Sequence, residues 1–127
     1  MLTIGKIDRK IDSCVSEHIL TDEVIITEER LAHIRERHPN DYARFQSLIS
    51  QILKDPDYIL EDKHPNTAMV LKTFYDVQQG NHFRIALRLI TPEDALEYKN
   101  SVITFMKIRE KEFQRLIRNK IVLYKKE

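Results

Sequence analysis

The hydrophobic rhythm of the chain changes near residue 55, and this change limits the folds that the chain can adopt. Between residues 27 and 54, apolar residues recur at the spacings of three, four and seven that amphipathic helices show. After residue 57 they fall in short runs rich in β-branched and aromatic residues, which is the pattern of strands. Helices followed by consecutive strands indicate an α+β fold with an antiparallel sheet.

Two helices are expected in the first half of the chain. Thr27 is a suitable N-cap residue, and two glutamates follow it in the first turn, where the helix dipole favours acidic side chains. This helix should end at His38, because Pro39 disfavours a helical backbone in the residue before it. A second helix is expected over about 41–54.

Four strand-forming runs follow, and we expect them to pair as a four-stranded antiparallel sheet accompanied by one late helix. The runs cover 58–60, 67–74, 82–90 and 101–108, with a hairpin turn at 78–81; the late helix covers about 109–119, with further strands at 24–26 and 121–124 and a strand or loose arm at 2–8. Because the helices are expected to cover one face of this sheet, the other face remains available for a site.

The composition excludes several classes of protein. The 127 residues, of which 42% are apolar and 32% charged, fit a single globular domain over 1–127. One cysteine, Cys14, cannot form an internal disulfide, and two glycines are too few for a glycine-rich phosphate loop. No signal peptide and no apolar run of about 20 residues is present, so we expect a cytoplasmic protein that does not enter a membrane. Any anion site must be built from side chains or helix ends.

The net charge of +1 conceals an uneven distribution of charge. Residues 1–98 carry 12 basic and 17 acidic side chains, whereas residues 99–127 carry 9 basic and 3 acidic ones. A basic terminal block of this kind is typical of chains with a polyanionic partner, and Lys107 is a candidate for substrate binding within it. A solvated helix face is the alternative interpretation.

The run 82–90 has the clearest alternation in the chain. Its odd-numbered residues are apolar, and Arg84 and Arg88 lie among its even-numbered ones, so both arginines should lie on one face of the strand. Their Cα atoms would be roughly 13 Å apart. Long side chains reaching over Ala86 could hold one phosphate between them. Two ordinary surface arginines are the alternative.

His38 is the candidate general acid. With Leu31 and Ile34 it continues the apolar stripe of the first helix, and it stands at the negative end of the helix dipole, which favours the protonated imidazole. A histidine that merely ends the helix is the alternative. His33 is five residues away from His38, which does not align two metal ligands, so we expect neither a metal site nor a cofactor.

Four further polar residues lie among apolar neighbours in the expected strands. Glu61 could act as a base, and Lys72 could stabilise the charge of a phosphorane. Ser101 or Thr104 could donate a hydrogen bond to a phosphate oxygen. Ordinary strand polarity explains each of them equally well.

Three segments resemble a known nuclease family. ITEERLAHIRERHP at 26–39, DPDYILED at 55–62 and the run from 100 to 113 resemble motifs of the phage-associated barnase–EndoU–colicin–RelE-like nucleases, in the same order. The resemblance implies a small α+β fold of phage or mobile-element origin, with a site on the open face of an antiparallel sheet. It also implies a metal-independent ribonuclease that uses histidine, arginine and a hydroxyl residue.

Carried onto this chain, the resemblance selects His38, the two strand arginines and the hydroxyls of Ser101 and Thr104. The expected function is therefore an endoribonuclease in which Glu61 or His38 deprotonates the ribose 2′-OH, and in which His38 acts as the acid if Glu61 is the base. RNA, tRNA included, is the expected partner. The alternatives are a catalytically silent module that docks a phage structural protein, and a toxin held by a cognate antitoxin.

Overall fold

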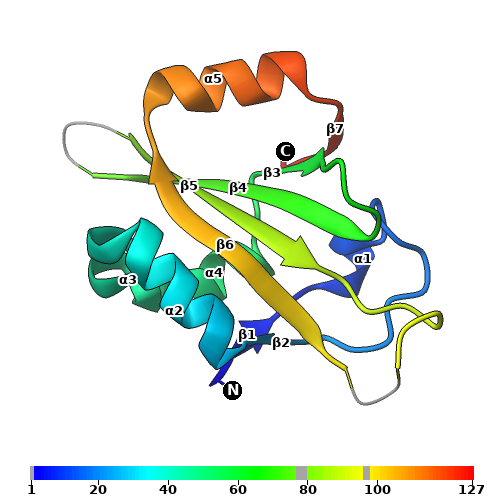
Figure 1. Cartoon of the computed structure of the whole chain (residues 1–127). Coiled ribbons are helices and arrows are strands. Elements are labelled where there is room, and N and C mark those ends of the chain that lie inside the picture. The colour runs from blue at the N-terminus through cyan, green and yellow to red at the C-terminus, as the bar shows by residue number, and fades with distance from the viewer. Residues whose placement is uncertain (1, 77–79, 96–97) are drawn as a thin grey trace.

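The computed structural model describes residues 2–76, 80–95 and 98–127, and it is built around one seven-stranded mixed sheet (Figure 1). The strands lie in the order β1-β2-β6-β5-β4-β3-β7. Their bounds are Leu2–Lys6 (β1), Glu23–Ile26 (β2), Tyr58–Glu61 (β3), Thr67–Tyr75 (β4), Gly80–Arg88 (β5), Asn100–Ile108 (β6) and Val122–Lys125 (β7). The predicted α+β class is confirmed.

The prediction of a four-stranded antiparallel sheet was wrong in size and in one pairing. β3, β4, β5 and β6 are antiparallel neighbours as predicted, but β7 extends this sheet at the β3 edge, and β1 and β2 extend it at the other. β2 pairs with β6 in parallel. The hairpin turn predicted at 78–81 falls partly on 77–79, outside the described residues, and Gly80 already belongs to β5.

The helices of the first half begin and end largely at the predicted signals. The bounds of the helical segments are Arg9–Asp12 (α1), Glu28–Arg37 (α2), Pro39–Phe45 (α3), the 3-10 turn Gln46–Leu48 (η1), Ile49–Lys54 (α4) and Glu110–Asn119 (α5). Thr27 caps α2 by accepting the backbone N–H of Arg30 at 3.2 Å, and α2 ends at His38 as predicted. The single helix predicted over 41–54 was wrong, because the helix breaks after Phe45, whose ring packs edge-on against Phe83 at 4.9 Å.

Helices lie on both faces of the sheet, contrary to the expectation that they cover only one (Figure 1). The larger core joins one face to α2, α3 and α4, with fully buried Ile34, Ile52 and Phe83 at its centre. On the opposite face, Phe113 and Leu116 of α5 pack against apolar side chains of β3, β4 and β6. The late helix therefore has a core of its own.

A histidine holds the start of α5 against the sheet. The ring of His82 stacks on that of Phe113, with 4.1 Å between the centroids. Nδ1 of His82 lies 2.7 Å from the hydroxyl of Thr73, and Nε2 lies 2.5 Å from the carboxylate of Glu110. The contacts of α5 are thus concentrated at one end of β5, and the end of β5 near Arg88 stays uncovered.

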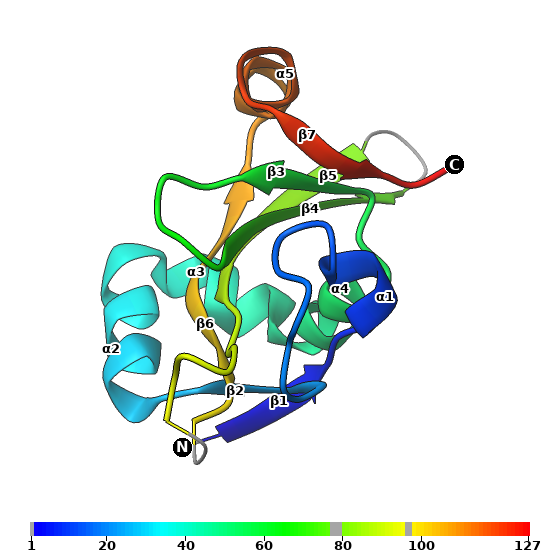
Figure 2. The same cartoon turned by 90° about the vertical axis from the view of Figure 1, so that its right-hand side faces the viewer.

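The uncovered half of this face lies between two projecting segments. Figure 2 shows α2 and the loop between β3 and β4 projecting in the same direction, both to the left of β6 in this view. Neither segment belongs to the sheet itself, so the face is open but flanked. This arrangement positions the candidate site.

A fully buried asparagine connects β2 and β6. Asn100 accepts the backbone N–H of Ile90 at 2.8 Å and donates to the carbonyls of Thr21 at 2.7 Å and Glu23 at 3.0 Å. These three bonds link the segments that precede β2, follow β5 and begin β6. None of the described helices has the length and apolar character needed to cross a membrane.

Candidate active site

A cavity of about 510 Å³ opens on the half of the sheet face that α5 leaves uncovered. Its floor comes from β4, β5 and β6, and its walls from α2 and the loop between β3 and β4. The lining residues are Arg30, Asp62, Lys63, His64, Pro65, Thr67, Arg84, Ala86, Arg88, Ile103 and Thr104. Four of these side chains are lysine or arginine and one is a carboxylate, so the cavity favours an anionic ligand.

Strand register brings three of the predicted site residues to this cavity. Ala86 pairs with Thr104 of β6, and residues that face each other in antiparallel strands project on the same side of the sheet. Thr104 therefore lies beside Ala86, which stands between Arg84 and Arg88 on their shared face. Arg84, Arg88 and Thr104 thus line one cavity, and their chemical roles stay predictions.

Arg84 is the lining cation with the least satisfied side chain. Its Nε is buried and has no hydrogen-bond partner among the described residues, and no described carboxylate forms a salt bridge with it. The pKa of Glu112 on α5 is lowered mainly by the hydrogen bond from Arg115, with the charge of Arg84 as a smaller cause. A buried guanidinium nitrogen without a partner is unfavourable, and an anion that pairs with the rest of the guanidinium would offset this cost.

Arg88 differs from Arg84 because its partners hold it in place. One nitrogen donates to Oδ1 of Asp94 at 2.9 Å, and another donates to the carbonyl of Leu89. The pKa of Asp94 is lowered, first by the backbone N–H of Thr91 and then by the charge of Arg88. Arg88 is therefore fixed in direction and partly neutralised before any ligand binds.

The loop between β3 and β4 contributes His64, which sequence reasoning did not select. The backbone N–H of His64 donates to Oδ2 of Asp62 at 2.9 Å. Asn66, in the left-handed region at φ 53°, accepts the hydroxyl of Ser16 at 2.6 Å, and its carbonyl accepts the N–H of Leu89 at 2.8 Å. The loop is thereby tied to β5, and His64 is the only histidine among the residues that line the cavity.

Arg30 is the second cavity residue that sequence reasoning did not select. Arg30 is an exposed residue of α2, and the helical pattern does not distinguish a residue that faces solvent from one beside a neighbouring sheet. Arg30 lies one turn after the Thr27 cap, and the start of α2 lies beside β6. This position in the helix is the signal that could have identified Arg30. The parallel pairing of β2 with β6 brings this part of α2 to the cavity, and the sequence does not reveal that pairing.

Four other predicted residues do not line this cavity. Ser101 lines a neighbouring cavity of about 440 Å³, and Lys107 lies over the ring of Phe45, 5.6 Å from its centroid. His38 is half-buried between α2 and α3, and Glu61 is exposed at the end of β3. None of the four lies among the residues that surround Arg84 in the cavity.

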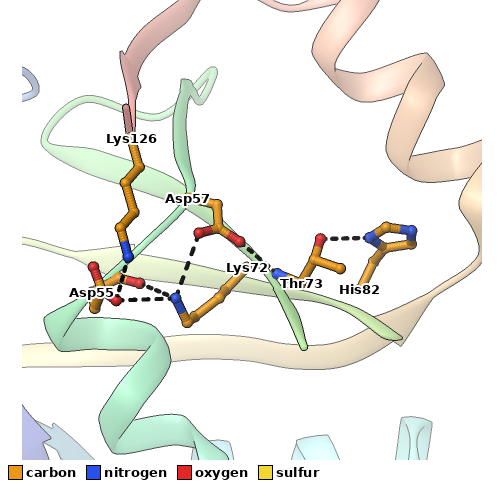
Figure 3. Close-up of polar contacts among 6 residues, drawn as sticks. All are labelled: Asp55, Asp57, Lys72, Thr73, His82 and Lys126. Atoms are coloured by element: carbon orange, nitrogen blue, oxygen red, sulfur yellow. Dashed lines mark hydrogen bonds and ion pairs between the residues drawn. The ribbon is translucent and has the colours of Figure 1, made fainter. Parts of the chain in front are cut away.

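Lys72 lies on the opposite face of the sheet. It pairs with Phe83 of the larger core, and its Nζ donates to the carbonyl of Asp55 at 2.6 Å (Figure 3). The same nitrogen lies 3.3 Å from the Asp55 carboxylate and 3.5 Å from that of Asp57. A lysine that is 7% exposed and engaged in this way holds the turn before β3, away from the cavity.

The described residues contain no cluster of three or more histidine, cysteine, aspartate or glutamate side chains able to hold a metal ion. The cavity consequently presents cationic side chains, hydroxyls, one imidazole and one carboxylate as its own reactive groups. These groups are suited to binding a phosphate and to moving protons.

Comparison with known proteins agrees with this chemistry. No curated protein and no solved structure matched the chain. A family model described as phage-Barnase-EndoU-ColicinE5/D-RelE like nuclease2 matches residues 3–125, which include all of the sheet except Leu2, the first residue of β1. The chain therefore belongs to this phage-associated family of Barnase-, EndoU-, colicin- and RelE-like nucleases.

Proposed function

We propose that this nuclease is an endoribonuclease that cleaves RNA in the cavity above Ala86, through attack of a ribose 2′-OH and without a metal ion. The observation that carries the proposal is the buried, unpartnered Nε of Arg84 on the floor of a cationic cavity. A phosphodiester supplies an anion for the guanidinium of Arg84, which forms no salt bridge with another described residue. RNA also supplies its own nucleophile, so the protein needs only to stabilise charge and transfer protons.

The reaction assigns a role to each group. The 2′-oxygen forms a bond to phosphorus while the bond to the 5′-oxygen breaks, which leaves a 2′,3′-cyclic phosphate and a 5′-hydroxyl. Arg84 stabilises the negative charge of the phosphorane, and the hydroxyl of Thr104 donates a hydrogen bond to a nonbridging oxygen. The Asp62 carboxylate accepts the proton of the 2′-OH, and His64 donates a proton to the leaving oxygen.

The test is cleavage of single-stranded RNA in the presence of EDTA. Wild type should generate cyclic phosphate ends and should leave the same sequence intact as DNA, which lacks the nucleophile. Arg84→Gln should lower kcat/KM by about 100-fold or more, the usual effect of removing one donor to a developing oxyanion. Arg118→Gln, on the exposed side of α5, is the matched control and should retain wild-type cleavage.

Two histidine variants separate the possible acids. His64→Ala should lower kcat by about 100-fold or more, whereas His38→Ala should retain activity. If His38→Ala loses activity and His64→Ala keeps it, the general acid is His38, as the sequence predicted. Salt-sensitive binding of RNA by a well-folded wild type that never cleaves it would contradict the proposed function and support the silent interaction module.

A further inference from the structure

The second cavity shares Arg88 with the first and differs from it in charge. It measures about 440 Å³ and is lined by Thr27, Arg88, Asp94, Tyr98, Lys99 and Ser101 together with apolar side chains. Arg88 lines both cavities and therefore forms the boundary between them. A ligand that crosses Arg88 occupies both.

The cations of the second cavity are already neutralised. Arg88 is paired with Asp94, and Lys99 forms a salt bridge with Glu23. In the first cavity, Arg30, Lys63 and Arg84 form no salt bridge with another described residue. The first cavity thus has an excess of positive charge, which suits a phosphate, and the second has balanced charge, which suits a neutral group.

The surface of the second cavity fits a flat, largely apolar group with a few polar edges. Ile25 and Ile90 contribute apolar walls, and the hydroxyls of Thr27 and Ser101 contribute hydrogen-bonding groups. The side chain of Tyr98 stands at this cavity and 59% of the residue is exposed. An exposed aromatic ring beside a charge-balanced pocket is a typical stacking platform for a nucleobase.

The two cavities adjoin closely enough to hold neighbouring parts of one nucleic acid strand. Ala86 is on the floor of the first cavity, and Arg88 at the boundary follows two residues later, about 7 Å along the strand. A phosphate held in the first cavity between Arg84 and Arg88 would leave the adjoining nucleoside at the second cavity. No phenylalanine or tyrosine lines the first cavity among the described residues, whereas Tyr98 lines the second.

From these observations we propose that the second cavity is a nucleoside subsite, in which an unpaired base adjoining the scissile phosphate stacks on Tyr98. This inference rests on the proposed function, and it makes single-stranded RNA, rather than a duplex, the substrate at the cleaved step. A base in a duplex is already stacked on both sides and is not free to lie on a tyrosine ring.

The decisive measurement combines cleavage with binding. Cleavage of a single-stranded RNA is compared for wild type, Tyr98→Ala and Tyr98→Phe, with Tyr75→Ala as the matched control because Tyr75 is 82% exposed and lies away from both cavities. Tyr98→Ala should raise KM by about 10-fold, and Tyr98→Phe and Tyr75→Ala should stay near wild type. When the substrate carries an abasic ribose at the adjoining position, the KM of wild type should rise by the same factor. The KM of Tyr98→Ala should not rise further with this substrate.

Binding of an uncleavable probe separates the subsite from catalysis. The probe is a short single-stranded oligonucleotide of 2′-deoxyribose that carries 2-aminopurine, whose fluorescence is quenched on stacking. Quenching that is lost in Tyr98→Ala but kept in Tyr98→Phe supports the subsite even if wild type fails to cleave RNA, in which case only the proposed function fails. RNA cleavage with the same KM for wild type and Tyr98→Ala, together with equal quenching, overturns the subsite and leaves the proposed function intact.

Discussion

The protonation of a buried aspartate should govern the pH dependence of stability. Asp12, the last residue of α1, is 1% exposed, and neither of its carboxylate oxygens has a hydrogen-bond partner among the described residues. Burial, and secondarily the charge of Asp8, raises the pKa of Asp12 from 3.8 to about 7. In the folded protein the carboxyl therefore holds its proton over a range in which the unfolded chain has lost it.

The sign and size of the effect follow from this difference. Because the folded state binds the extra proton, the contribution of Asp12 to stability is complete below pH 3.8 and is lost as the pH rises through about 7. A rise of about 3 pKa units, at 1.36 kcal/mol each, corresponds to about 4 kcal/mol of destabilisation once the group is ionised. Asp12→Asn removes the ionisation and keeps the shape of the side chain.

The assay is urea unfolding of wild type and Asp12→Asn at about pH 5 and about pH 8. The free energy of unfolding of the variant relative to wild type should increase by about 3 kcal/mol between the two conditions. Asp8→Asn is the control for the cause, since burial is the larger contribution and most of the pH dependence should remain. A difference between wild type and Asp12→Asn that does not change with pH would refute the reasoning, because it would mean that the buried carboxyl does not titrate in this range.

Three other substitutions test contacts that hold the sheet together, each by urea unfolding. Asn100→Ala removes three hydrogen bonds at a fully buried position and should destabilise the fold by roughly 3 kcal/mol, whereas the exposed Asn119→Ala should have little effect. Lys72→Met should destabilise by roughly 2 kcal/mol, less than for a fully buried pair because both carboxylate partners reach solvent. Glu110→Gln should change stability by less than about 1 kcal/mol, since Glu110 is largely exposed although it pairs with His82.

Local signals predicted the parts of the site that depend on a single element. The cap at Thr27 and the proline after His38 act on their own helix, so the bounds of α2 could be deduced without the rest of the fold. The alternation of β5 likewise separates Arg84 and Arg88 from the core, because side-chain direction in a strand has a period of two.

Residues that reach the site through other elements could not be identified in this way. Seven consecutive residues of β4, from Thr67 to Thr73, are buried, so the strand shows no alternation from which the face of Lys72 could be deduced. His64 belongs to a loop, and its neighbours are determined by the pairing of β4 with β5. The parallel contact of β2 with β6 joins distant segments by backbone bonds, and such bonds leave no pattern in the side chains.

The same parallel contact has a consequence for the order of folding. β3, β4, β5 and β6 follow one another along the chain and pair as neighbours, whereas the bond from Asn100 to Glu23 spans 77 residues. Closing so long a loop is entropically expensive and is expected late. The floor of the cavity should then form before α2 brings Arg30 to its wall, and native-state amide exchange should be faster in β2 than in β5. A partly opened molecule would keep the floor of the cavity while losing one of the walls beside it.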